Sequence, residues 1–200
     1  LNAQADILSY QNKNDLAIEK SMMVLEVKDQ DPTEYSEAFQ SLSTSYLAKG
    51  IIDSTDKYTI LTFQNDTINN LTNRIANSTT RLGEMYARRG ENEKAIITYM
   101  KALDLIPKEK ETRKNRTYLN LADAFFDIQD LEKSEQYLKL SLQLSEANNL
   151  KSSISNAVYR LGNIEEIRGN HQKAIEYYNR ILLHYKNTKN NKMKANTHLG

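Results

Sequence analysis

The chain has 200 residues with 27 Lys and Arg against 26 Asp and Glu, so its formal net charge of +1 would not draw it onto nucleic acid or an anionic membrane. It contains no cysteine, which excludes disulfides and thiolate metal sites and leaves the compartment open. With only two Pro and six Gly, and no run of about 18 apolar residues, the sequence favours long helices and predicts no membrane span.

The N-terminal residues predict an incomplete helical hairpin. Leu1 to Asp6 do not have the pattern of a signal peptide, and because the chain begins with Leu we expect it to be a fragment of a longer protein. Residues 14–27 carry apolar side chains at helical spacing and are interpreted as the second helix of a hairpin. The first helix of this partial repeat, 1–32, would be cut by the start of the chain.

Residues 36–70 predict a degenerate hairpin. Its first helix has Phe39, Leu42 and Tyr46 at helical spacing and is followed by Gly50. Its second helix, over 53–69, has threonine where larger apolar residues or alanine are expected, at Thr55, Thr59 and Thr62. We therefore expect this helix to be less stable than the others.

Three regular copies of the same unit follow, at 76–109, 115–148 and 155–188. The glycines set the register, because Gly83 and Gly90 lie seven residues apart and so do Gly162 and Gly169. The equivalent small-residue positions recur at 43, 83, 122, 162 and 200, with spacings of 40, 39, 40 and 38. Residues 193–200 are interpreted as the start of a further repeat.

The copy around Gly83 resembles the tetratricopeptide-repeat (TPR) consensus, because it contains Leu82-Gly83, Tyr86, Gly90, Ala95, Tyr99, Ala102 and Pro107 at matching offsets. The resemblance covers nearly the whole chain. Its period of about 40 exceeds the usual 34 and is similar to the long-repeat TPR segments of bacterial regulatory and sensor proteins. Equivalent residues are Tyr118, Leu121, Ala122, Phe125, Ser134, Leu138 and Ser141 in the next copy, and Val158, Leu161, Gly162, Glu165, Gly169, Ala174, Tyr178 and Ile181 in the one after.

The resemblance implies an all-α fold, a right-handed α-solenoid (α-α superhelix) of TPR helix-turn-helix hairpins that forms a single domain over 1–200. Small residues such as Gly83 and Gly162 are expected where the two helices of a hairpin cross. Gly90 and its equivalents would cap the first helices, whereas Gln129 occupies this position in one copy and predicts a less well formed or differently capped turn. The extra residues between hairpins predict about one added helical turn.

No residue pattern indicates catalysis or metal binding. His171, His184 and His198 lie 13 and 14 residues apart, which does not bring ligands together on one helical turn. Glu165 and Glu166 are adjacent on a helix and point in different directions, which disfavours an acid/base pair. Two basic runs, 108–116 and 186–194, are interpreted as solvated connections. We therefore predict no enzymatic activity, no metal and no cofactor.

The family fold implies a concave groove lined by the first helices, and the polar face of each such helix supplies candidate binding residues. Asn amides offer donors and acceptors to the backbone of an extended peptide, and Arg and Tyr are frequent interface anchors. The predicted groove residues are Asn77, Thr80, Glu84, Arg88, Arg116, Asn120, Asp123, Asp127, Asn156, Tyr159, Arg160 and Asn163.

One known binding mode of the family is not fully present. TPR chaperone adaptors hold a C-terminal carboxylate with a Lys/Asn pair, then Asn, then Lys and Arg on successive first helices. Asn120 and Arg160 match two of those positions, whereas Thr80, Glu84 and Asn156 replace the others. A complete carboxylate clamp is therefore not expected.

The leading hypothesis is a scaffold that binds a protein or peptide, as the sensory or interaction region of a bacterial signalling or transcriptional regulator. The alternative is a structural module that self-assembles or oligomerises through its solenoid ends, near Gly200. No nucleic-acid partner and no membrane insertion are expected for this segment. An enzyme is the third class, and no catalytic residues favour it.

Overall fold

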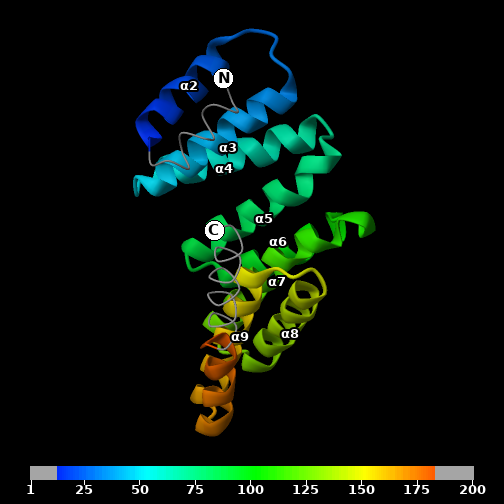
Figure 1. Ribbon diagram of the computed structural model, residues 1–200. Coiled ribbons are helices and arrows are strands. Elements are labelled where there is room, and N and C mark those ends of the chain that lie inside the picture. Colours follow the sequence, from blue (N-terminus) through cyan, green and yellow to red (C-terminus); the bar gives the residue numbers. More distant parts are fainter. Residues whose placement is uncertain (1–12, 183–200) are drawn as a thin grey trace, which may run out of the picture. The chain divides into compact units, whose positions relative to one another are not determined.

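The computed structural model describes residues 13–182, which are all-helical without a strand (Figure 1). The chain divides after Ile106 into two compact units, described here over 13–106 and 107–182 and called the N-terminal and C-terminal units. The all-α prediction is confirmed over this range. The predictions for 1–12, for the end of the 155–188 repeat and for 193–200 lie outside the described residues.

The N-terminal unit consists of α2 (Asn14–Glu26), α3 (Pro32–Ala48), α4 (Ile52–Ile68), α5 (Thr72–Arg88) and α6 (Asn92–Leu105). Each helix packs against the next along the chain, so α3–α4 and α5–α6 form hairpins, and α2 packs on α3 (Figure 1). Helix α3 begins with Pro32 at its first position, and the Asp31 carboxylate accepts the Thr33 backbone N–H at 2.6 Å.

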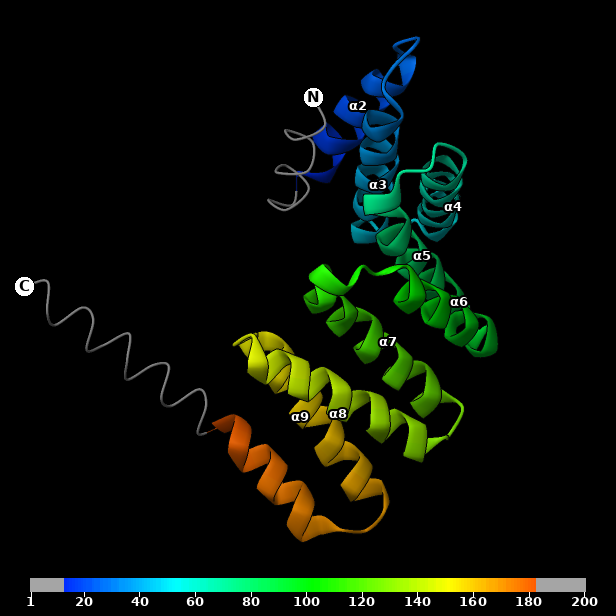
Figure 2. The ribbon, with the colours of Figure 1, turned by 90° about the vertical axis from the view of Figure 1, so that its right-hand side faces the viewer.

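The C-terminal unit consists of the 3₁₀-helix η1 (Lys108–Arg113), α7 (Lys114–Asp127), α8 (Leu131–Ala147), α9 (Lys151–Ile167) and a helix over 171–182. Figure 2 shows α7 and α8 side by side as a hairpin, and α9 packs on α8. Helix η1 precedes α7, and α9 begins at Lys151 rather than near 155. Residues 108–113 and 151–154 are therefore helical at these two connections between hairpins.

Small residues at the helix crossings are required by the aromatic rings that face them. A Cβ atom on Gly83 would lie 2.5 Å from Cε1 of Tyr99, and one on Gly162 would lie 2.5 Å from Cε1 of Tyr178. In the α7–α8 hairpin, the crossing is instead closed by the Ser134 hydroxyl, which donates to the Ala122 carbonyl at 2.8 Å. The predicted crossing positions are confirmed in these hairpins.

The turns after the first helices share one left-handed conformation, and the prediction for Gln129 was wrong. Its φ of 63° matches the 73° of Gly90. The Gln129 N–H donates to the Phe126 carbonyl at 2.9 Å and the next N–H to Phe125 at 2.9 Å, as Gly90 does to Ala87 at 2.9 Å. These two hydrogen bonds satisfy the carbonyls at the end of α7, so the cap forms despite the cost of a left-handed non-glycine residue.

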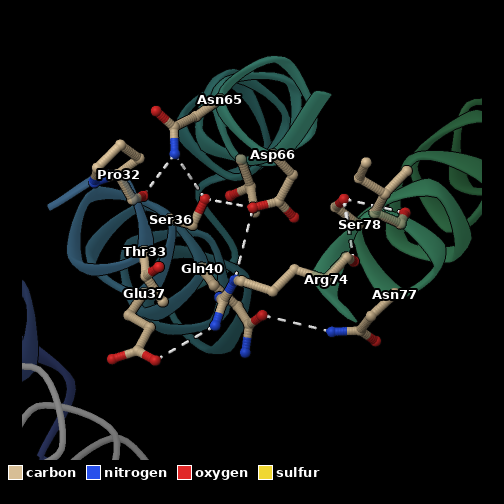
Figure 3. A network of polar contacts seen from close by, with 12 residues as sticks. Pro32, Thr33, Ser36, Glu37, Gln40, Asn65, Asp66, Arg74, Asn77 and Ser78 are labelled. Carbon is tan, nitrogen blue, oxygen red and sulfur yellow. Dashed lines mark hydrogen bonds and ion pairs between the residues drawn. The ribbon is translucent and has the colours of Figure 1, made fainter. Parts of the chain in front are cut away.

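The degenerate hairpin α3–α4 is closed by a polar network (Figure 3), in addition to the stacking of Tyr58 on Phe39 and Tyr46. Asn65 on α4 donates its side-chain amide to the Pro32 carbonyl at 2.7 Å and to the Ser36 hydroxyl at 2.8 Å. Ser36 in turn donates to the buried Asp66 carboxylate. Thr55, Thr59 and Thr62 are buried, and each hydroxyl donates a hydrogen bond to the backbone carbonyl four residues earlier, at 2.7–2.9 Å.

Arg74 on α5 extends this polar network to the next hairpin (Figure 3). Its guanidinium lies between the Glu37 carboxylate of α3, at 3.2 Å, and the Asp66 carboxylate of α4, at 3.5 Å. Beside it, the Asn77 amide donates to the Gln40 side chain at 3.4 Å. Helices α3, α4 and α5 are therefore joined by charged and amide groups where a regular repeat has apolar side chains.

Candidate functional site

The C-terminal unit contains a pocket of about 290 Å³ between the first helices α7 and α9, with α8 behind them. Two aromatic rings and several amide and charged groups converge there. The lining residues are Asp123 and Phe126 of α7, Ser134 and Leu138 of α8, and Asn156, Tyr159, Arg160 and Asn163 of α9.

The α8 side of the pocket is rigidly held by the core of the unit. Leu138 is fully buried and belongs to one cluster with Ala122, Leu161 and Ile164. The other α8 lining residue, Ser134, is buried and its hydroxyl is occupied by the Ala122 carbonyl. Since these groups come from three helices, the hydrophobic core itself places the α8 side relative to α7 and α9.

Arg160 connects the two walls. From α9 its Nη1 atom donates to the Leu119 carbonyl of α7 at 3.1 Å and lies 2.6 Å from the Asp123 carboxylate. Burial raises the pKa of Asp123 above its ordinary value, Arg160 opposes that shift, and the nearby Asp127 carboxylate adds to it. Arg160 therefore supports the pocket by joining α9 to α7, in addition to placing positive charge at its edge.

Asn163 and Tyr159 are oriented by a tyrosine from the helix over 171–182. The Tyr178 hydroxyl lies 2.8 Å from the Asn163 side-chain oxygen and 2.9 Å from the Glu166 carboxylate, so the Asn163 nitrogen is left as the donor for the pocket. The Tyr159 and Tyr178 rings have centroids 5.9 Å apart, yet Tyr159 remains 54% exposed. The pocket thus presents an aromatic surface next to amide groups.

The structure brings only part of the predicted groove set together. Asp123, Asn156, Tyr159, Arg160 and Asn163 line the pocket. The remaining predicted residues of α7 do not line it: Arg116 and Asp127 are exposed and Asn120 is half-buried on the same helix.

The predicted residues of α5 lie in the N-terminal unit and have other surroundings. Thr80 is buried and its hydroxyl donates to the Ala76 carbonyl at 3.0 Å, so that hydroxyl is not presented to a ligand. Arg88 is exposed, and its guanidinium lies 3.1 Å from the buried Asp56 carboxylate of α4. Asn77 contacts Gln40, and Glu84 is half-buried.

Sequence reasoning missed Phe126, Ser134 and Leu138 as lining residues. Ser134 and Leu138 were assigned to hairpin packing, a role that they also have. Phe126 had a usable signal, because two consecutive phenylalanines on a helix cannot both face the core: Phe125 is buried and Phe126 is 36% exposed. Arg81 lies two residues before Gly83, as Arg160 lies two residues before Gly162, so it is the α5 equivalent of Arg160. It is not among the predicted groove residues.

Among residues 13–182, no group of three or more His, Asp or Glu side chains is placed to hold a metal ion. Over the same range, no helix has the length and apolar character needed to cross a bilayer.

Comparison with family models identifies the protein family of the chain. Two models described as tetratricopeptide repeat match residues 74–147 and 119–191, and together they span more than half of the 200 residues. The chain belongs to the TPR family. Among curated proteins, none matches the sequence significantly.

Solved structures share the TPR-like helical fold. BtubC from P. vanneervenii is 18% identical with a TM-score of 0.78, covering 92% of this chain and 78% of BtubC. A Rap protein complexed with competence and sporulation factor is 20% identical with a TM-score of 0.77, covering 90% of this chain and 51% of Rap, so the chain spans about half of that protein. TPR-like repeats of a kinesin light chain from Podosopora anserina are 14% identical with a TM-score of 0.73, covering 94% of each chain.

Proposed function

We propose that this TPR protein is a scaffold that binds an extended peptide or protein segment at the pocket between α7 and α9. The observation that carries the proposal is the meeting of exposed aromatic surface, from Tyr159 and Phe126, with the amides of Asn156 and Asn163. Aromatic rings accept apolar side chains, and amides hydrogen-bond to a peptide backbone. The proposal assigns no reaction to the chain.

The size of the pocket limits what enters it. Ligand sites for whole small molecules are usually about 300–1,000 Å³. At about 290 Å³ the pocket lies at the lower end, which suits one or two side chains of a longer peptide. We propose that the rest of the peptide extends along α7 past Asn120 and Arg116, so that these predicted groove residues contact it outside the pocket.

The same scaffold is proposed to be the sensory or interaction region of a bacterial signalling or transcriptional regulator. Support comes from the likeness of fold to a Rap protein, whose structure is a complex with competence and sporulation factor. The alternative of self-assembly through the solenoid end concerns residues near Gly200, outside the described range, and stays a prediction.

The variants that test the pocket must leave its supports intact. Arg160→Glu is unsuitable, because a carboxylate there would face Asp123 and remove the bond to the Leu119 carbonyl. Asn156→Ala with Tyr159→Ala is better, since both side chains are exposed. The matched control removes exposed polar side chains of α8 outside the pocket, with Gln136→Ala and Gln143→Ala.

The experiment selects binding heptapeptides from a random phage-displayed library against the whole chain and measures their affinities by isothermal titration. We expect the pocket variant to bind about 30-fold more weakly, or about 2 kcal/mol, with a melting temperature close to that of the parent. The control should bind like the parent. Failure to select any peptide, or equal affinity for the pocket variant and the parent, would refute the proposal.

A further inference from the structure

Ion pairs between successive hairpins recur at equivalent positions of the chain. In the N-terminal unit, Arg89 follows α5 and its Nε atom lies 2.7 Å from the Asp56 carboxylate of α4. In the C-terminal unit, Arg168 follows α9 and its Nη1 atom lies 2.6 Å from the Glu135 carboxylate of α8. Both members of the pair are displaced by 79 residues from one unit to the other. The contact is therefore a repeated feature of the fold.

A third pair and one exception support this interpretation. Lys49, the equivalent residue after α3, pairs with Asp15 of α2. In each of the three pairs, the acidic residue lies near the start of the second helix of one hairpin. The basic residue lies at the end of the first helix of the following hairpin. At the corresponding positions of α6 and α7 the sequence has Ile96 and Ile128, which cannot form an ion pair.

The contacts around the pair also recur, with different chemistry. In the C-terminal unit, Glu165 accepts from Arg168 at 3.2 Å and lies 3.9 Å from the Lys173 amine. The equivalent residues in the N-terminal unit are Tyr86 and Lys94, whose amine lies 5.7 Å from the tyrosine ring centroid. A cation–π contact thus replaces an ion pair at the same place.

We infer that these ion pairs act as a repeated latch, which fixes the ends of α3, α5 and α9 against the second helix before each of them. In the C-terminal unit the latch positions the α9 wall of the pocket, since Arg168 binds Glu135, the neighbour of the pocket residue Ser134. Arg168 is a positioning residue. This last step rests on the proposed function, whereas the latch itself does not.

In the α4–α5 and α8–α9 pairs, the burial of the acid explains why the latch matters more than an ordinary surface pair, whereas the Asp15 side chain of the third pair is 87% exposed. The Asp56 side chain is 4% exposed and that of Glu135 is 21% exposed. Removing the arginine would leave Asp56 with Arg88 alone, at 3.1 Å, and Glu135 with Lys139 alone, at 2.5 Å. Losing one of two cationic partners of a largely buried carboxylate costs more than breaking an exposed pair. The Arg180–Glu146 pair between α8 and the helix over 171–182 has both side chains about half exposed, at 45% and 46%, and serves as the control.

The test combines hydrogen exchange with peptide binding on the whole chain. In Arg168→Gln we expect the amides of 164–170 to exchange at least about tenfold faster, because the end of α9 is released. Arg168→Lys should recover much of the protection. Glu135→Gln should resemble Arg168→Gln, and the double variant should be little worse than either single one, because both changes break the same contact. Arg180→Gln should change exchange in 164–170 by less than about twofold.

The binding readout uses the heptapeptides selected against the parent chain. Affinity in Arg168→Gln should fall by about fivefold or more and recover in Arg168→Lys, although Arg168 does not line the pocket. Unchanged exchange in Arg168→Gln, or equal effects of Arg168→Gln and Arg180→Gln, would overturn the latch. Faster exchange with unchanged peptide affinity would overturn only its role in the pocket. A failure to select peptides affects the proposed function and leaves the exchange test in place.

Discussion

At the scale of single residues, a glycine is required on one helix of a hairpin because a tyrosine ring from the other helix occupies the space of its side chain. The sequence predicted that Gly83 and Gly162 lie at helix crossings, and the structure adds that tyrosines fill the space. The two rings differ in freedom, because Tyr99 is 2% exposed and Tyr178 is half-buried. This difference is not visible in the sequence motif, where the two tyrosines have the same offset.

Gly83→Ala and Gly162→Ala are therefore expected to differ. Alanine gains about 1 kcal/mol of helix propensity over glycine, against an overpacking cost of about 1–3 kcal/mol. Because the Tyr99 ring is enclosed, Gly83→Ala should lose about 1–2 kcal/mol of unfolding free energy. Because the Tyr178 ring is only half-buried and less enclosed by neighbours, Gly162→Ala should stay within about 0.5 kcal/mol of the parent.

Urea unfolding followed by circular dichroism measures both changes. Leucine at either position should cost about 2 kcal/mol or more, since neither ring can make room for it. Equal stability of all four variants and the parent would mean that these glycines do not lie at crossings.

The Asp123–Arg160 ion pair should add little stability at neutral pH, despite its short distance. Burial raises the pKa of Asp123, so folding favours the protonated form. The stability linked to that proton is present below the unfolded pKa of about 3.9 and is lost as pH rises through the higher folded pKa. Relative to the parent, Asp123→Asn should therefore gain unfolding free energy as the pH rises from 4 to 7.

Urea unfolding at the two pH values tests this sign. Asp127→Asn is a useful companion, because removing that carboxylate should lower the pKa of Asp123 and reduce the effect. A loss of relative stability in Asp123→Asn on going from pH 4 to pH 7 would contradict the expectation.

At the scale of elements, periodicity and turn residues predicted the hairpins but not the means by which each is closed. The threonines of α4 indicated a weak helix, yet nothing in their spacing showed that Ser36, Asn65 and Asp66 would close the hairpin with polar groups. The Gln129 prediction was wrong for a similar reason, because the turn depends on backbone hydrogen bonds to Phe125 and Phe126 that the side-chain type does not reveal. Long-range ion pairs such as Arg168–Glu135 need the packing of helices before they can be recognised.

Helix α4 is expected to be the least protected internal helix in hydrogen exchange. Its buried face has Thr55, Thr59 and Thr62, which bury less apolar area than leucine or isoleucine and use their hydroxyls within the helix. Exchange of residues 53–69 should be faster than that of 95–105 in α6. Equal protection in the two helices would show that the polar network compensates for the missing apolar contacts.

At the scale of the whole molecule, stability in a repeat protein is approximately the sum of hairpin and nearest-neighbour terms. The fold class followed from the resemblance of the repeats to the TPR consensus, whereas the location of the pocket required the positions of α7, α8 and α9. A local defect should accordingly weaken the hairpins next to it and fade along the chain.

Gly83→Leu is expected to raise hydrogen exchange strongly in α5 and α6, and by no more than about twofold in α9, two hairpins further along. Gly162→Leu should give the reverse pattern, with α9 affected and α5 spared. A uniform increase over all helices in either variant would show that the chain unfolds as one cooperative body.

The displacement of 79 residues that relates the latches also relates longer stretches of sequence. Asn69-Asn70-Leu71 recurs as Asn148-Asn149-Leu150, and Arg81-Leu82-Gly83 recurs as Arg160-Leu161-Gly162. Such matches relate positions that lie two hairpins apart. The α5 face around Arg81 and the α9 wall around Arg160 therefore occupy matching places in the two units, and the same helix face has different polar surroundings in each.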